Sequence, residues 1–365
     1  MMTPKKIEAA LTARCNLRCV YCAHFSSASD VTHDLSTAEW LAFFEELNRC
    51  AVLRIVLSGG EVFCRSDLRE LIHGIVKNRM RFSLLTNGTQ IDDAIIDFIA
   101  ATGRCDTVQV SVDGSRAQIH DATRGEGSFI RATEGIKTLK KYGIAVSVRV
   151  TINKYNVYDL EEITRLLLEE VGLNGFSTNE AGYQGLCRQN SEKVQLDIEE
   201  YSSAMRELLR LNKKYNNRIS AAAGPLANAR LWLKMVQAHT HNKETFPGAG
   251  YLVGCGGPRE QIAVRADGVI VPCILLSHIE LGRINRDSLK EIWQGHPALL
   301  QLRERKSIPL SDFEFCKGCE YIRYCTGSCP ALSYNVLNNE YHPDPTSCLK
   351  RFLEGGGILP TEVTC

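Results

Sequence analysis

Three cysteines near the start of the chain have the spacing of a metal-binding loop. Cys15, Cys19 and Cys22 fall within eight residues and directly follow a strand-like segment. A structural zinc site is closed by four protein ligands, whereas a four-iron cluster takes one ligand on each iron. Three thiolates from one loop would leave one iron of such a cluster free to bind another molecule. The alternatives are a zinc site completed from elsewhere in the chain, or three cysteines without a shared role.

A second set of seven cysteines lies toward the C-terminus. They are Cys255, Cys273, Cys316, Cys319, Cys325, Cys329 and Cys348. The first residues of the chain contain no apolar stretch long enough for a signal peptide, so a cytoplasmic location is expected. Disulfides are rare in that compartment, and the spacing of the fifteen cysteines therefore indicates metal binding. One or two structural zinc sites are the alternative for this second set.

The segments that must position these cysteines alternate between strand and helix. Six strand-like segments are predicted at 7–12, 53–57, 82–86, 107–112, 145–151 and 175–178. Helix-start signals follow at Ser36, Asp67, Asp92, Gly127 and Asn156, and a later one at Asp197. Repeated strand–helix units favour parallel strands with right-handed crossovers. In an open sheet or a partial barrel of this kind, ligands bind at the C-terminal ends of the strands.

On these residues the chain resembles the radical S-adenosylmethionine (SAM) enzymes. Their motif is Cys-x3-Cys-x2-Cys with an aromatic residue, here Tyr21, just before the last cysteine. The resemblance implies an α/β fold with a partial (β/α)6 TIM-like barrel. It also implies a [4Fe–4S] cluster whose open iron is chelated by SAM. One electron from that cluster would cleave SAM to a 5′-deoxyadenosyl radical, which takes a hydrogen atom from the substrate.

The same resemblance assigns SAM-binding roles to residues at the strand ends. Ser58-Gly-Gly-Glu61 is similar to the Gly-Gly-Glu-Pro motif of the family, although Val62 replaces the proline. Arg124 is the expected partner of the SAM carboxylate, because a guanidinium matches the geometry of that group. The complete set implied by the resemblance is Tyr21, Ser58, Gly59, Gly60, Glu61, Thr86, Asn87, Ser111, Asp113 and Arg124.

The C-terminal cysteines resemble those of the SPASM domain, a small cysteine-rich α+β extension that holds auxiliary [4Fe–4S] clusters. The resemblance assigns an outer cluster to Cys316, Cys319, Cys325 and Cys348, and an inner cluster to Cys255, Cys273 and Cys329. The inner set has only three ligands, which implies an open iron or a borrowed ligand such as Cys187. The implied segments are a barrel over 1–190, a helical connector over 191–250, the SPASM domain over 251–352 and a tail over 353–365.

SPASM enzymes mostly modify ribosomally made peptides by crosslinking, oxidation, decarboxylation or epimerisation, and this chain is expected to do so too. Only 14 residues precede Cys15, so any leader recognition is expected to come from a separate small protein. A radical dehydrogenase or haem-type biosynthetic enzyme acting on a small molecule is the alternative, and a non-catalytic iron–sulfur scaffold is a third. Glu180 is a candidate base, and Cys187 a candidate hydrogen-atom donor or iron ligand.

The net charge and the hydropathy of the chain limit the binding partners that we expect for it. The formal net charge is only +1, which provides no field to attract nucleic acid or an anionic membrane. No run of about 18 apolar residues indicates a membrane span. The expected partners are the substrate and, from the resemblance, an electron donor such as flavodoxin or ferredoxin.

Overall fold

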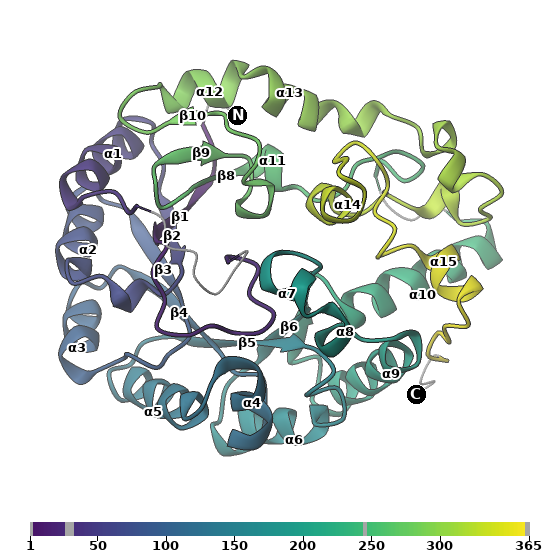
Figure 1. Ribbon diagram of the computed structural model, residues 1–365, viewed down its shortest axis with the longest axis horizontal. Coiled ribbons are helices and arrows are strands. Elements are labelled where there is room, and N and C mark those ends of the chain that lie inside the picture. Colours follow the sequence, from purple (N-terminus) through teal and green to yellow (C-terminus); the bar gives the residue numbers. More distant parts are fainter. Residues whose placement is uncertain (1–2, 26–32, 244–246, 362–365) are drawn as a thin grey trace.

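The strands of the chain form one curved sheet with helices around its outside (Figure 1). The computed structural model describes residues 3–25, 33–243 and 247–361. Ten strands lie in the order β10-β9-β8-β1-β2-β3-β4-β5-β6-β7. Their bounds are β1 (Lys6–Thr12), β2 (Arg54–Gly59), β3 (Arg81–Thr86), β4 (Cys105–Ser111), β5 (Val146–Ile152), β6 (Phe176–Glu180), β7 (Ile219–Ala221), β8 (Gln261–Val264), β9 (Val269–Val271) and β10 (Gly282–Arg283).

The strands β1 to β7 are parallel to their neighbours throughout. Each of the first six lies within two residues of the segment predicted from the sequence, so the prediction of a partial α/β barrel is confirmed. The helices between these strands cover the outer face of the sheet in Figure 1. They are α1 (Thr37–Arg49), α2 (Leu68–Lys77), α3 (Asp93–Ala101), α4 (Ala117–Arg124), α5 (Ser128–Lys141) and α6 (Leu160–Arg165).

Most of the predicted helix starts are confirmed. Ser36 forms a capping box with Glu39, in which each side chain bonds the backbone N–H of the other residue. The prediction for Asn156 is wrong, because α6 begins three residues later, after Asp159. The Asn156 amide instead donates to the backbone carbonyls of Asp113 and Thr151, at 3.0 and 2.9 Å. An asparagine that looks like a helix cap in the sequence thus joins the ends of β4 and β5.

The two faces of the sheet differ in polarity. On β1, Ile7 and Leu11 are buried against the helices, whereas Glu8 and Ala10 face the inside of the barrel. The strands that follow repeat this alternation, with Ile55 and Leu57, Phe82 and Leu84, Val108 and Val110, and Val148 and Val150 in the core. Successive strand residues point to opposite faces, so the core lies between sheet and helices. The inner face is therefore left free to form a site.

The sheet continues beyond the barrel at both edges. At one edge β8 pairs in parallel with β1, and β9 and β10 follow as antiparallel strands. At the other edge β7 lies in the segment predicted to be a purely helical connector, and at three residues it is too short to show a strand pattern. The first three of the four predicted segments thus contribute strands to one sheet. Their limits near 190 and 250 remain predictions.

The second half of the chain combines two 17-residue helices, α9 (Ile198–Lys214) and α10 (Pro225–His241), with many shorter elements. Its other α-helices are α7 (Gly185–Gln189), α8 (Ser191–Val194), α11 (Gly257–Glu260), α12 (Leu289–Gly295), α13 (Pro297–Glu304), α14 (Pro330–Leu337) and α15 (Leu349–Glu354). Six 3-10 turns occur in the described residues, and five of them follow residue 270. Small apolar clusters, one around Trp232 and Phe352, pack this region.

Candidate active site

The loop that carries the first three cysteines is held firmly by its neighbours. Thr12 and the backbone N–H of Ala13 bond the Asp34 carboxylate, at 2.5 and 2.7 Å. Further along, Leu186 donates its N–H to the Cys22 carbonyl at 2.9 Å. Gly185, with φ +54°, lies so close to the loop that an added Cβ would be 2.4 Å from the Phe25 carbonyl oxygen. A larger residue there would push the loop away from the barrel.

Cys15, Cys19 and Cys22 all line a cavity of about 540 Å³ at the C-terminal ends of the barrel strands. Burial raises the pKa of Cys15 to about 12 and that of Cys19 to about 11. These thiols would stay protonated at neutral pH unless a metal held them as thiolates. The structure thus brings together the three residues predicted to bind a cluster, beside a space large enough for a second ligand.

The end of β2 approaches this loop closely because it carries two glycines. A Cβ on Gly59 would lie 2.4 Å from the Thr12 carbonyl oxygen, and one on Gly60 would lie 2.2 Å from that of Arg14. Gly59 also has φ +143°, which few other residues adopt. Ser58, Gly59 and Gly60 line the cavity as predicted from the family motif.

Glu61 joins the ends of two neighbouring strands. Its carboxylate is buried and accepts hydrogen bonds from Thr86 Oγ1 at 2.7 Å and from the Asn87 N–H at 2.6 Å. Burial raises the pKa of Glu61, and these hydrogen bonds oppose that effect. The side chain is not among those that line the cavity, whereas Thr86 and Asn87 are. Glu61 therefore fastens the end of β3 to the end of β2, and its role in SAM binding stays a prediction.

Arg124 lies in the cavity wall and is fixed by a buried acid. Its Nε donates to Asp113 Oδ2 at 2.6 Å, and the Tyr21 hydroxyl donates to the same oxygen. The other carboxylate oxygen accepts the Thr151 N–H at 2.7 Å. Although burial acts in the opposite direction, the Asp113 charge raises the pKa of Arg124. Asp113 does not line the cavity, so it orients Arg124 and Tyr21, and it is not itself a cavity contact.

The inner face of the barrel adds polar residues that the sequence analysis missed. Glu8, Gln109, Arg149 and Asn179 all line the cavity, together with the predicted Ser111. Ser58 Oγ donates to Glu8 at 3.1 Å, and burial raises the pKa of Glu8. The signal was present in the sequence as polar residues at every second position of the strands. The sequence analysis used these segments only to predict parallel strands.

The hairpin of β8 and β9, with the turn after Cys273, closes the cavity from the other side. Arg265, Asp267, Ile274, Leu275 and Ser277 belong to its lining. The Arg265 guanidinium donates hydrogen bonds to the Asp267 carboxylate at 2.5 Å and to the Ser277 carbonyl at 3.2 Å. The C-terminal region thus supplies part of the wall of the barrel site.

The C-terminal cysteines gather in the two groups that the resemblance implies. Cys316 interacts electrostatically with Cys319, Cys325 and Cys348. Cys255 is hydrogen-bonded to Cys329 and lies near Cys273. Because Ile274 and Leu275 line the barrel cavity, the group with Cys273 is the one beside the barrel.

A site for a single metal ion needs a different arrangement of ligands from a site for an iron–sulfur cluster. Within the residues that the structure describes, no three His, Cys, Asp or Glu side chains are arranged to hold a metal ion. The ligands of a four-iron cluster need not converge on one point, because each binds a different iron.

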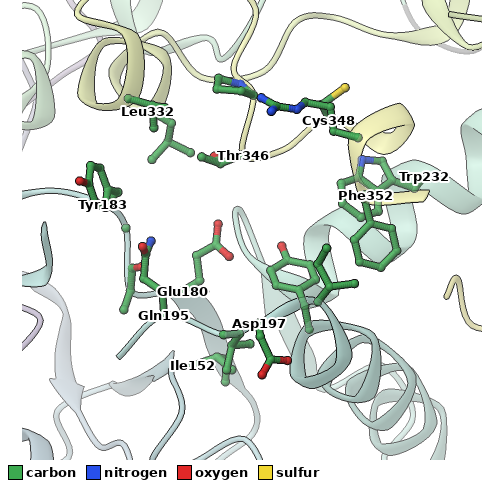
Figure 2. Close-up of a pocket in the computed structure, with 18 residues that line it drawn as sticks. Ile152, Glu180, Tyr183, Gln195, Asp197, Trp232, Leu332, Thr346, Cys348 and Phe352 are labelled. Carbon is green, nitrogen blue, oxygen red and sulfur yellow. The ribbon is translucent and has the colours of Figure 1, made fainter. Parts of the chain in front are cut away.

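A second cavity of about 410 Å³ lies between the barrel and the C-terminal helices (Figure 2). Its walls include Trp232 of α10, Phe352 of α15 and Cys348 of the outer cysteine group. Glu180, at the end of β6, points into this cavity and also lines the first. Burial and the nearby Asp344 charge raise the pKa of Glu180 to about 7, against a hydrogen bond from Tyr201. Glu180 therefore stands where the two cavities meet.

The other candidate for catalysis, Cys187, lies elsewhere. Its side chain is fully buried in a small apolar cluster with Tyr21, Ala181 and Val194. It lines neither cavity, and burial raises its pKa to about 11. The position of Cys187 favours a packing role beside the cysteine loop. It argues against a role as hydrogen-atom donor or iron ligand.

Comparison with known proteins matches two domain families. Residues 10–167 match the radical SAM superfamily, and residues 255–320 match SPASM, an iron–sulfur cluster-binding domain. The AdoMet-dependent heme synthase of Methanosarcina barkeri is 28% identical, over 95% of this chain and 97% of its own length. The PqqA peptide cyclase of Ruegeria pomeroyi is 25% identical, over 94% of this chain and 86% of its own.

Among solved structures, Streptococcus suis SuiB bound to its precursor peptide SuiA has the same fold. It gives a TM-score of 0.72 at 15% identity, covering 96% of this chain and 76% of that one. In the described part of this chain, no helix is both long and apolar enough to cross a membrane.

Proposed function

This chain belongs to the radical SAM superfamily and carries a SPASM domain, and on that premise we propose that it modifies a ribosomally made peptide by radical chemistry. The observation that carries the proposal is the 540 Å³ cavity, in which three loop thiols, a fixed arginine and a polar barrel wall meet. Each of these parts has a role in the proposed reaction.

The SAM half of the site is formed by the cysteine loop and the strand ends. A cluster held by Cys15, Cys19 and Cys22 would supply the electron that cleaves SAM. Arg124 lines the cavity with its Nε already held by Asp113, so its fork is oriented before any ligand arrives. A pre-oriented guanidinium suits a carboxylate such as that of SAM.

The substrate half is polar, which favours a peptide. Glu8, Gln109, Asn179 and Glu180 offer carboxylate and amide groups toward the cavity. A peptide backbone needs hydrogen-bond partners when it is buried, whereas the apolar face of a large macrocycle does not. The second cavity, which meets the first at Glu180, provides room for residues flanking the modified one.

Glu180 is the base that we assign to the reaction. A pKa of about 7 places this carboxyl group near neutral pH, where it can both accept and return a proton. The hydroxyl of Tyr201, which bonds Glu180, accepts a hydrogen bond from Asn228 at 2.7 Å, so the carboxylate is oriented by a short chain of contacts. The remaining partners proposed are two auxiliary [4Fe–4S] clusters, a flavodoxin or ferredoxin as electron donor, and a small leader-binding protein.

A second function is favoured by a specific observation. A full-length relative that is 28% identical to this chain is a heme synthase, and Arg149 of β5 also lines the cavity. An arginine in this position can pair with a carboxylate side chain of a tetrapyrrole. The second candidate is therefore radical modification of such a carboxylate-bearing macrocycle.

One experiment tests both. The protein is reconstituted with iron and sulfide without oxygen, reduced with dithionite and given SAM, and 5′-deoxyadenosine is measured. The same reaction then receives deuterated candidate peptides encoded beside the gene, or deuterated iron coproporphyrin. Deuterium transfer to 5′-deoxyadenosine from a peptide supports the first function, and transfer from the tetrapyrrole supports the second. Absence of 5′-deoxyadenosine under every condition would contradict both.

A further inference from the structure

Arg305 is a buried cation without an ion-pair partner among the described residues. It follows α13 and begins a 3-10 turn, and only 2% of its surface is exposed. Its Nε and Nη2 are buried and make no hydrogen bond. A guanidinium stays charged in proteins, so it cannot escape this situation by losing its proton. An unpaired buried charge destabilises a protein strongly, so such a group normally has a partner.

The surroundings of Arg305 show where that partner belongs. A Cβ on Gly254 would lie 2.8 Å from Arg305 Nη1 and 2.5 Å from the Ser328 carbonyl oxygen. Gly254 precedes Cys255, and Ser328 precedes Cys329. The guanidinium therefore lies beside the two backbone segments that carry these cysteines. Its electrostatic partners begin with Cys329 and Cys255, followed by Tyr341 and Glu340.

We propose that Arg305 is the cationic partner of the inner auxiliary cluster, donating N–H groups to its sulfur atoms and raising its reduction potential. This rests on the proposed function, which places a cluster on Cys255, Cys273 and Cys329. A cluster bound by thiolates is anionic, and it becomes more negative when it gains an electron. A fixed positive charge and N–H···S hydrogen bonds stabilise that reduced form.

Other positive groups near the site act less directly. Arg259 also affects Cys255, but its side chain is half-buried, and solvent screens its charge. Arg303, two residues before Arg305, donates its Nε and Nη1 to the carbonyls of Pro258 and Trp293, at 3.0 and 2.7 Å, and only its Nη2 is buried without a hydrogen bond. Arg303 lies over the Trp293 ring and has no cysteine among its electrostatic partners. It is therefore a matched control for Arg305.

The test compares Arg305→Gln, Arg305→Lys and Arg303→Gln in the full-length, anaerobically reconstituted protein. Iron content is measured first, and each cluster is then followed by electron paramagnetic resonance during a redox titration. Arg305→Gln is expected to make reduction of the inner cluster at least tenfold less favourable, a shift of 59 mV to lower potential for one electron. Arg305→Lys keeps the charge and should shift less, and Arg303→Gln should leave the potential unchanged.

The outcomes separate this inference from the proposed function. If Arg305→Gln cannot hold the inner cluster but Arg305→Lys can, the need for a charge at this position is supported. Equal potentials in all variants, or equal cluster loss in both Arg305 variants, would overturn the inference. SAM cleavage by the first cluster is measured on the same samples. Normal cleavage with an unmoved inner potential rejects the role of Arg305 alone, and no cleavage in the unaltered protein rejects the proposed function.

Discussion

The two cysteine-bearing regions present the same kind of ligand in different surroundings. The loop of Cys15, Cys19 and Cys22 is tied to the barrel by backbone hydrogen bonds and by close contact with glycines. The cysteines from Cys316 onward lie among short helices and 3-10 turns that pack on small apolar clusters, whereas β8, β9, α12 and α13 share the main core with the barrel. The first loop is positioned by the barrel, whose apolar core contains none of its three cysteines. The segment from Cys316 onward has few apolar contacts of its own to stabilise it. Metal binding and folding should therefore be coupled there.

The largest expected effect comes from removing the first set of ligands. Replacement of Cys15, Cys19 and Cys22 by alanine should abolish formation of 5′-deoxyadenosine. If three four-iron clusters are loaded, iron should fall from about twelve to about eight atoms per chain. The melting temperature should change little, because the barrel core contains none of these residues. Cleavage of SAM that persists in this variant would refute the assignment of the site.

The next largest effect is expected from removing ligands of the outer cysteine group. Replacement of Cys316 and Cys319 by alanine should lower the melting temperature by about 10 °C, equivalent to a few kcal/mol in a chain of this size. Calorimetry of the reconstituted protein measures the shift, and Cys50→Ala, a half-buried cysteine on the barrel side, serves as the control. An unchanged melting temperature would show that the C-terminal region folds without its metal.

A smaller effect is expected at Arg124. Arg124→Lys keeps the charge but loses the Nε bond to Asp113 and the planar fork. Binding of SAM should weaken about tenfold, which is about 1.4 kcal/mol, and equilibrium dialysis of the anaerobic protein would measure it. Arg116→Lys, at the exposed N-terminal cap of α4, the helix that ends at Arg124, is the matched control. Equal affinities in the two variants would remove Arg124 from the SAM site.

Glu180, where the two regions meet, links pH to both activity and stability. Its folded pKa of about 7 lies above the ordinary value of 4.5, so the folded state favours the protonated form. The activity of a base at this position should fall as the pH drops through 7. The cost of Glu180 to folding stability has the opposite pH dependence. The buried charge destabilises the folded state fully above pH 7 and not at all below about pH 4.5.

The variant Glu180→Gln should therefore lose the base while gaining stability at high pH, on the order of 3 kcal/mol at most. Urea unfolding at pH 8 and pH 5 would measure the gain, which should be larger at pH 8. Glu199→Gln, on the exposed face of α9, is the control. A gain that is equal at both pH values would contradict the raised pKa.

The sequence predicts the parts of this site that depend on residue type and local order. The strand ends, the glycines at 59 and 60 and the cysteine groups follow from motifs and spacing. The function of Glu61 and Asp113 did not follow, because the direction of a buried carboxylate depends on which backbone N–H groups lie nearby. The second cavity could not be predicted either, because Glu180, Trp232 and Phe352 are far apart in the sequence and meet only in the folded chain.

The smallest effect is expected at Cys187, which tests whether burial alone explains that residue. Cys187→Ala removes one sulfur atom from an apolar cluster beside Tyr21 and should cost about 1 kcal/mol of stability. Product formation should stay within about twofold of the unaltered enzyme, because the thiol reaches neither cavity. Iron content should also be unchanged, measured beside Cys105→Ala, a cysteine at the start of β4. A large loss of product with full iron content would instead make Cys187 a hydrogen-atom donor, and the loop would then have to open toward it during the reaction.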